Sequence, residues 1–389
     1  MKKYLIVGNG AAGTTAAEEI RKKDTTGEIT VLSNEDMPFY SRIRLPEFMS
    51  KEIPEEALII KKKKWYEDLN IRLELKTTVV QADADKKVVT SVEGKTFSYD
   101  ALLIATGSHS FIPPIQGLEK EGVFSVRNVE DVRHILHYAE ATKDVVLIGG
   151  GLLGLECGNA IRKLGKKVTV VEFFPRLLPR QLDVEGAQRL QVMMEAMGFD
   201  FVLGAKTKAI TGNGKVSGVL LEGGPEISAQ MVLISAGVRP NLEMADFLGL
   251  EKDKGIKVDG QMRTSMPDVF AAGDVAEFKG MVYGIWPAAT DQGKIAAANM
   301  AGDSTVYEGT PMSNKLKVVG IDLASAGNID TENQMESKIL KNGDTYKKIV
   351  FSDKVIAGAI MLGDTKNFNK IVKMMADQKD ISQIKDGLF

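Results

Sequence analysis

Two stretches of the chain share one pattern of apolar and polar positions. Each has a short apolar run, Tyr4–Val7 or Val145–Ile148, followed by a glycine-rich turn and a segment whose small or apolar residues recur every fourth position. Those residues are Ala12, Ala16 and Ile20 after the first turn, and Leu153, Cys157 and Ile161 after the second. The pattern predicts a buried strand, a turn and a helix with one face on a sheet. Residues 4 and 145 lie 141 positions apart, so we expect two copies of one unit.

A second repeat closes each of these units. The run Ala101–Gly107 (ALLIATG) is echoed by Met231–Gly237 (MVLISAG), and a proline-containing turn follows each run. The turns are the expected hinge points. The chain is therefore predicted to be an α/β protein with two Rossmann-like dinucleotide-binding domains and a small α+β domain at its end. The expected boundaries are 1–112 with 241–308 for the first domain, 113–240 for the inserted domain, and 309–389 for the last, with short strands near 316, 349 and 355 and a helix at 367–375.

The three glycines of each turn have separate tasks in dinucleotide binding. The first allows a tight bend, the second lets the backbone approach a pyrophosphate, and the third lets the helix pack closely on the strand. The phosphates then lie at the helix N-terminus, where unpaired N–H groups and the helix dipole favour negative charge. The glycines are Gly8, Gly10 and Gly13 in the first turn and Gly149, Gly151 and Gly154 in the second. One such turn is weak evidence, but the pair predicts two dinucleotides.

An acidic residue at the end of the following strand is expected to hold each ribose. Glu172 follows Gly154 by 18 positions, and a carboxylate there accepts hydrogen bonds from the ribose hydroxyls and repels a 2′-phosphate. This favours NADH over NADPH, with Arg176 leaving NADPH open as the minor alternative. In the first unit the acid comes later, and Glu35 is the expected ribose ligand.

A further apolar strand runs into Gly273 and Asp274. A carboxylate at such a strand end suits a ribityl hydroxyl or a phosphate-linked sugar. The simpler alternative is that Asp274 caps the next element. After two nucleotide-binding units, the cofactor interpretation is preferred.

Composition and charge exclude several classes of protein. The 389 residues are 44% apolar and carry a net charge of −2, which gives no sign of nucleic-acid binding. The first residues resemble a secretory signal, but the apolar run leads into the glycine turn without a cleavage pattern, so a folded strand is expected. No apolar stretch of the sequence approaches the length of a membrane span. The protein is expected to be cytoplasmic.

The chain has one cysteine, Cys157. It therefore forms no intrachain disulfide and supports no cysteine-ligated zinc or iron–sulfur cluster. Its position on the sheet-facing stripe of the second helix predicts a small buried side chain rather than a reactive thiol.

Five motifs occur in a fixed order: GNGAAG at 8–13, ATG at 105–107, GGGLLGLE at 149–156, SAGVRPN at 235–241 and TSMPDVFAAGD at 264–274. Over about the first 300 residues this combination resembles the FAD-dependent pyridine nucleotide oxidoreductases related to glutathione reductase. The resemblance implies that the first unit binds FAD and the inserted unit binds NAD(H). It also implies that Asp274 holds the flavin ribityl chain, that Glu156 lies near the nicotinamide, and that a helix starting near Pro287 points its N-terminus at the flavin. Trp286 would lie against the ring, with a core tryptophan as the alternative.

The resemblance implies two sets of cofactor ligands. The FAD set is Gly8, Gly10, Ala11, Ala12, Gly13, Glu35, Arg42, Val80, Thr106, Gly107, Gly273, Asp274 and Trp286. The NAD set is Gly149, Gly151, Leu152, Leu153, Gly154, Glu156, Glu172 and Gly237.

The chain departs from that family where thiol chemistry is concerned. It lacks the CxxxxC pair of disulfide reductases, and arginine stands where the family's oxidases and peroxidases carry a redox cysteine in a stretch shaped like Phe39–Pro46. The C-terminal His-Pro…Glu base of the disulfide reductases is also missing. Reduction of a disulfide or peroxide is therefore not expected. The tail is shorter than the family's dimerisation domain, which favours a monomer.

The stretches Tyr40–Glu47 (YSRIRLPE) and Ile59–Glu67 (IIKKKKWYE) are similar instead to NADH:rubredoxin reductases and to the flavin portion of assimilatory nitrite reductases. This similarity implies hydride transfer from NADH to flavin and release of single electrons to a small iron protein, with rubredoxin preferred. Arg42, Arg44 and Glu156 would form the flavin and nicotinamide environment, the arginines stabilising reduced flavin. Structural pairing of both arginines with acidic neighbours such as Glu47 is an equal alternative.

Other functions stay open at this point. An NADH oxidase using dioxygen, the electron-input subunit of a nitrite-type reductase and a nicotinamide-binding flavoprotein sensor fit the same motifs. The run Lys61–Lys64 suits a docking patch for an acidic carrier or, more commonly, a solvated helix start. His134 and His137 have no third ligand in reach, so no metal is expected there. His109 is expected to line the cofactor cleft.

Overall fold

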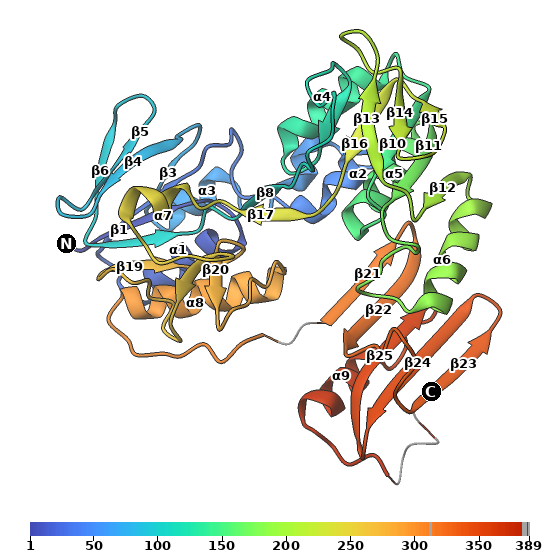
Figure 1. Cartoon of the computed structure of the whole chain (residues 1–389). Helices are drawn as coiled ribbons and strands as arrows, with labels where there is room; N and C mark the ends of the chain where they lie inside the picture. Colours follow the sequence, from blue (N-terminus) through green and yellow to red (C-terminus); the bar gives the residue numbers. More distant parts are fainter. Residues whose placement is uncertain (311–312, 383–386, 388–389) are drawn as a thin grey trace. The chain divides into compact units, whose positions relative to one another are not determined.

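The computed structural model describes residues 1–310, 313–382 and 387, with the backbone alone described for 313–317. The chain forms two compact units (Figure 1). Unit 1 consists of Met1–Arg42, Pro54–His109 and Val238–Thr310, and unit 2 of Ile43–Ile53, Ser110–Gly237 and Pro311–Phe389. Unit 2 therefore includes the tail and a short segment expected in the first domain, and the finer three-domain division stays a prediction.

Unit 1 is built on a five-stranded parallel sheet in the order β19-β7-β1-β2-β3. The strands are β1 (Lys3–Val7), β2 (Glu28–Leu32), β3 (Ile71–Glu74), β7 (Ala101–Ile104) and β19 (Val269–Ala271). Elements on both faces bury β1 and β7, which explains their continuous apolar runs. Two helices, α1 (Ala11–Lys23) and α8 (Trp286–Met300), pack closely, and a Cβ at Gly293 would lie 2.5 Å from the carbonyl oxygen of Ala12.

The remaining elements of unit 1 are short. An antiparallel sheet contains β4 (Val79–Asp83), β5 (Val88–Ser91) and β6 (Thr96–Ser98). Two strand pairs join β18 (Ile256–Val258) to β20 (Ala276–Phe278) and β8 (Ser108–Ser110) to β17 (Val238–Pro240). The helices are α3 (Lys63–Asp68), α7 (Glu243–Leu248) and the 3₁₀ turn η2 (Glu55–Leu58), and a second 3₁₀ turn, η1 (Arg42–Arg44), begins at the last residue of the first segment. The chain leaves and re-enters unit 1 through β8 and β17.

Unit 2 repeats the parallel sheet of unit 1, with the order β12-β11-β10-β16-β9. Its strands are β9 (Val123–Ser125), β10 (Asp144–Ile148), β11 (Lys167–Glu172), β12 (Phe199–Leu203) and β16 (Met231–Ile234). The neighbours of β10 correspond to those of β1, which confirms two copies of one unit. The helices are α2 (Leu45–Met49), α4 (Val129–Ala139), α5 (Leu152–Lys163) and α6 (Val184–Ala196), and β13 (Thr207–Thr211), β14 (Gly218–Leu221) and β15 (Glu226–Ser228) form an antiparallel sheet.

The tail forms an antiparallel sheet in the order β21-β22-β25-β24-β23, covered by one helix. These elements are β21 (Ser313–Val318), β22 (Ile321–Gly327), β23 (Ser337–Asn342), β24 (Thr345–Ser352), β25 (Val355–Leu362) and α9 (Phe368–Ala376). The expected strands and terminal helix are confirmed. The α/β class with a small C-terminal α+β domain is confirmed with them.

A buried charged cluster joins α6 to this sheet within unit 2. Asp183 accepts a 2.9 Å hydrogen bond from Gly186 N–H at the start of α6, and its other oxygen accepts one of 2.7 Å from the Tyr346 hydroxyl. The fully buried Lys348 Nζ lies 3.4 Å from Asp183 and donates to the carbonyl of Asp330 at 2.7 Å. Because removing one member would leave a buried charge unpaired, the cluster holds these elements together.

The helices of the described residues are short. The longest is α8, with 15 residues. Across 1–310, 313–382 and 387, no helix combines the length and apolarity needed to cross a bilayer.

Candidate functional site

The glycine turn of unit 1 connects β1 to α1. Gly8 has φ +119°, and a Cβ there would lie 2.0 Å from the carbonyl oxygen of Ala105, just after β7. A Cβ at Gly13 would lie 2.0 Å from the carbonyl oxygen of Gly8. Gly10 differs, because nothing lies within 4 Å of its Cβ position. Packing therefore explains the first and third glycines, and the approach of a ligand at the second stays a prediction.

The turn of unit 2 has the same geometry. Gly149 has φ +111°, and its Cβ would lie 2.3 Å from the carbonyl oxygen of Ser235. A Cβ at Gly154 would lie 2.5 Å from the carbonyl oxygen of Gly149. At Gly151 the Cβ position is open to 4 Å. Each unit thus leaves one open glycine at the N-cap of the helix that follows its glycine turn, α1 or α5.

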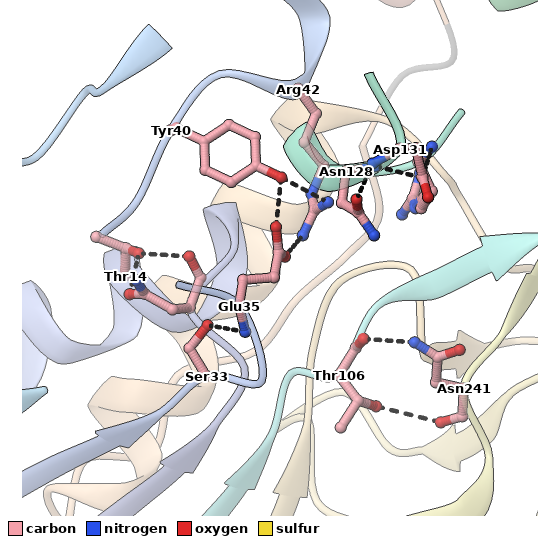
Figure 2. Close-up of polar contacts among 11 residues, drawn as sticks. Thr14, Ser33, Glu35, Tyr40, Arg42, Thr106, Asn128, Asp131 and Asn241 are labelled. Atoms are coloured by element: carbon pink, nitrogen blue, oxygen red, sulfur yellow. Dashed lines mark hydrogen bonds and ion pairs between the residues drawn. The ribbon is translucent and has the colours of Figure 1, made fainter. Parts of the chain in front are cut away.

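Both helix N-termini suit an anion. Neither α1 nor α5 has a side-chain cap hydrogen bond or an acidic residue in its first turn, as far as the described residues go. In contrast, Asn128 and Asp131 cap α4 (Figure 2). In the unit 1 turn the Asn9 Nδ2 is buried and has no partner in the described structure. Free N–H groups, an unpartnered amide and an open glycine together fit a pyrophosphate.

Glu35 follows β2 and lies between two partners. Its carboxylate accepts a hydrogen bond from the Tyr40 hydroxyl and pairs with the Arg42 guanidinium (Figure 2). Arg42 also donates to the Tyr40 oxygen at 3.2 Å. Burial alone would lower the pKa of Arg42, but its interactions with Tyr40, Glu35 and Asp274 raise it overall. Arg42 is therefore a permanent positive charge beside the expected ribose ligand.

The turn after β7 meets the end of β19. Ser108 donates a 2.8 Å hydrogen bond to Asp274, and Gly107 has φ +69°. The Thr106 hydroxyl donates to the carbonyl of Asn241 at 3.1 Å, and the Asn241 side chain donates back to the Thr106 carbonyl at 2.8 Å (Figure 2). Asp274 lies at the expected strand end, and its contact with the ribityl chain stays a prediction.

The start of α8 agrees with the expected helix near Pro287. Trp286 is the first residue of α8, and its ring centroid lies 5.6 Å from that of Phe39. The Gly273 N–H, one residue before Asp274, donates to Gln292 of α8 at 2.8 Å. The sequence analysis named no role for Gln292, because a glutamine inside a helix carries no motif.

On the unit 2 side, Glu172 ends β11 as expected and is 6% exposed. Its carboxylate accepts hydrogen bonds from the N–H groups of Gly150 and Phe174, so it also holds the glycine turn. Arg176 donates to the carbonyl of Pro179 at 3.3 Å. The carboxylate is thus fixed at the expected ribose position, and ribose binding itself stays a prediction.

Glu156 lies in the second turn of α5 and contacts the tail. Its carboxylate accepts a 2.7 Å hydrogen bond from the Val319 N–H, between β21 and β22. Burial raises the pKa of Glu156. Its place near a nicotinamide stays a prediction. On the expected sheet-facing stripe of α5, Cys157 and Ile161 are buried and Leu153 is half-buried.

The remaining candidates lie at the surface. Arg44 donates to Glu47 at 2.8 Å, so both arginines have the acidic partners foreseen as the structural alternative, and their role at a flavin stays a prediction. Val80 is 45% exposed on β4. Lys61 and Lys64 pair with Glu18 and Asp68 in unit 1, and carrier docking stays a prediction.

Thiol and metal chemistry find little support. Cys157 is 1% exposed, as expected, and burial raises the pKa of its thiol. His134 and His137 are exposed on α4, and His134 faces Glu130 at 3.1 Å. In the part of the chain that the structure describes, no group of three or more His, Cys, Asp or Glu could hold a metal ion. His109 contacts Asn241 at 2.7 Å.

Residues 2–293 match the family model of the pyridine nucleotide-disulphide oxidoreductases. The chain belongs to this family. Residues 311–379 match the rubredoxin NAD+ reductase C-terminal domain. Proteins of the family bind FAD and use NADH, and the two uncapped glycine turns fit both dinucleotides in this family member.

The relatives carry more than one name. Nitrite reductase [NAD(P)H] of Bacillus subtilis (strain 168) is 36% identical over 387 residues, covering 98% of this chain and 48% of the relative, so this chain spans about half of that protein. Rubredoxin-NAD(+) reductase of Pseudomonas putida is 35% identical over 309 residues, covering 77% of this chain and 80% of the relative. The crystal structure of NADH:rubredoxin oxidoreductase from Clostridium acetobutylicum has a TM-score of 0.84 and 29% identity, and the match covers 98% of this chain and 97% of that one.

Because each turn has its own open glycine, substitutions there should impair the two dinucleotide sites independently. Gly10→Ala and Gly151→Ala meet no protein atom within 4 Å, so both variants should fold. We expect Gly10→Ala to be purified with at least about tenfold weaker FAD binding, and Gly151→Ala to keep its FAD and show a roughly tenfold higher KM for NADH. Flavin-to-protein absorbance and steady-state kinetics measure the two effects.

The third glycine provides the matched control. A methyl group at Gly13 would lie 2.0 Å from the Gly8 carbonyl oxygen, so Gly13→Ala should lower the melting temperature even before any ligand binds. Normal FAD content in Gly10→Ala together with an unchanged NADH KM in Gly151→Ala would contradict the assignment of both turns.

Glu156 predicts a pH effect on stability. Because its pKa is raised in the folded protein, ionisation costs stability as the pH rises from the ordinary value of about 4.3 through the raised value. Glu156→Gln keeps an oxygen for the Val319 N–H and removes this cost. We expect the variant to be more stable than the wild type at pH 7, with the difference vanishing near pH 4 in urea unfolding.

Glu67→Gln, at an exposed position on α3, is the control for this comparison. It should leave the pH profile unchanged. A Glu156→Gln protein less stable than the wild type at pH 7 would show that the ionised carboxylate is favoured in the fold.

Proposed function

We propose that this protein is an NADH-dependent flavoprotein oxidoreductase that passes electrons from NADH through FAD to a one-electron acceptor protein, with rubredoxin as that acceptor. Each NADH would give up a hydride, and two acceptor molecules would each take one electron while one proton is released. The observation that carries the proposal is the pair of open, uncapped glycine turns in a chain whose single cysteine is buried. Two dinucleotides fit, and no accessible thiol lies between them and an acceptor.

Named residues of unit 1 would hold the cofactor. When bound, FAD supplies an acceptor for two electrons and a donor of single electrons. Gly10 would admit the pyrophosphate, and Asp274, held by Ser108, would orient the ribityl chain. The N-terminus of α8 would favour negative charge on the flavin ring. Arg42 would add a positive charge there.

Unit 2 would bind NADH rather than NADPH. Glu172 keeps its carboxylate at the end of β11 through Gly150 and Phe174, where it would meet the ribose hydroxyls. A fixed negative charge there would repel a 2′-phosphate. Arg176 donates to the carbonyl of Pro179 instead. In that position it would not pair with a 2′-phosphate.

The choice of rubredoxin has support from the tail. Residues 311–379 match a domain named for rubredoxin NAD+ reductase, and relatives of that name match most of the chain. The second candidate is electron input to a nitrite reductase, because two relatives with 36% identity are named for nitrite and nitrate reduction. A relative from Methanocaldococcus jannaschii, 34% identical, is named NADH oxidase, so dioxygen is the third candidate acceptor.

Anaerobic stopped-flow would test the function. We expect NADH to bleach the flavin rapidly and oxidised rubredoxin to restore its colour much faster than dioxygen does. Ferricyanide serves as the control for general one-electron release. If rubredoxin does not accelerate reoxidation of the flavin, it is not the acceptor. Fast reoxidation by dioxygen would favour an oxidase. A colourless purified protein would contradict the FAD site.

Arg42 predicts an electrostatic effect. A guanidinium beside the flavin would stabilise the anionic reduced form, so Arg42→Ala should lower the flavin reduction potential and reduce turnover about tenfold. Arg72→Ala, which breaks a surface pair with Glu74, is the matched control and should change neither quantity. An Arg42→Ala protein with the wild-type potential and turnover would leave the pair with Glu35 as a structural contact alone.

A further inference from the structure

The turn at residues 105–108 is held from two sides within unit 1. On one side it rests on the glycine turn, since the Ala105 carbonyl oxygen fills the Cβ position of Gly8 and the Ala105 N–H donates to Val7 at 2.8 Å. On the other side Ser108 donates to Asp274 at 2.8 Å. The turn therefore lies at the carboxyl ends of the sheet strands, where α/β folds bind their ligands.

One residue from a distant part of the chain makes four hydrogen bonds along this turn. The Asn241 side-chain amide donates to the Thr106 carbonyl at 2.8 Å, and the backbone carbonyl of Asn241 accepts from the Thr106 hydroxyl at 3.1 Å (Figure 2). Its N–H donates to the Gly107 carbonyl at 2.9 Å. Its Oδ1 lies 2.7 Å from His109 Nδ1. Asn241 thus contacts three of the residues that follow β7.

The chemistry fixes the orientation of this amide. The Thr106 carbonyl only accepts hydrogen bonds, so the Asn241 Nδ2 must face it and the Oδ1 must face His109. His109 Nδ1 must then carry a hydrogen. An aspartate at position 241 would turn an oxygen toward the Thr106 carbonyl, and could not replace the amide.

Asn241 lies where the chain returns to unit 1. It follows β17 directly, and β17 pairs with β8, the two segments through which the chain leaves and re-enters unit 1. Gly107 has φ +69°, a backbone conformation that glycine adopts freely, so contacts with other residues must select it. The bonds of Asn241 therefore hold the turn where β8 begins and β17 ends.

We propose that Asn241 is a positioning residue for FAD: its amide holds the 105–108 turn in the shape that receives the flavin side of the cofactor. The proposal rests on the assignment of unit 1 to FAD, and not on the identity of the acceptor. The function of the residue is to keep Thr106, Gly107 and the Ser108–Asp274 pair in place before the cofactor binds, so that binding does not have to order them.

The test compares FAD release from purified holoenzymes. Loss of the side-chain donor to the half-buried Thr106 carbonyl predicts roughly tenfold faster release of FAD, seen as flavin fluorescence after dilution, from both Asn241→Ala and Asn241→Asp. The KM for NADH should stay unchanged, because Asn241 belongs to unit 1 and NADH is assigned to unit 2. In ¹⁵N spectra of Asn241→Ala the His109 Nδ1 signal should change from a protonated to a mixed tautomeric state, whereas Asn241→Asp keeps an oxygen acceptor there and should leave Nδ1 protonated.

Asn299→Ala is the matched control. Asn299 also donates to two backbone carbonyls in unit 1, those of Gln261 at 3.0 Å and Thr305 at 2.9 Å, but it lies near the far end of α8. It should lower the melting temperature without faster FAD release. Equal release from Asn241→Ala and the wild type, or equally fast release from Asn299→Ala, would overturn the proposal. A wild-type protein without flavin would overturn the FAD assignment and the proposal together.

Discussion

The contact between a strand-end carbonyl and the first glycine of each turn underlies both dinucleotide sites. In unit 1 the Ala105 carbonyl occupies the space beside Gly8, and in unit 2 the Ser235 carbonyl occupies the space beside Gly149. Any larger residue would force the closing strand away from the turn. The contact brings the N-terminus of the first helix to the carboxyl end of its sheet, and the open second glycine then leaves room for phosphate.

The parts of this arrangement that were predictable from the sequence are local. Strand runs, helix stripes and the three glycines follow from backbone conformation and periodicity within about a dozen residues, and the structure confirms them. The unforeseen contacts join distant residues, because a local motif does not show which partner each of its side chains meets. Asn241 and Thr106 are 135 positions apart, and Glu156 and Val319 are 163 apart.

The two copies differ most at the acid expected to hold the ribose. Glu172 uses its carboxylate to hold its own turn through Gly150, so its position is set by the unit itself. Glu35 is held by Tyr40 and Arg42, which follow it in the chain. A ribose at Glu35 would therefore compete with a hydroxyl and a guanidinium. Cofactor binding at Glu35 would thus be linked to the position of Arg42.

The buried thiol bears on how electrons would leave the protein. With Cys157 inside α5, the proposed path from NADH has no side chain that could store two electrons after the flavin. Electrons would then pass directly to whatever approaches the flavin edge, and the acceptor would be chosen by shape and charge there. Relatives named for rubredoxin and for nitrite reduction share this same stretch of chain, so the fold is compatible with both. Acceptor selectivity would then depend on the side chains around the flavin edge rather than on the glycine turns beneath them.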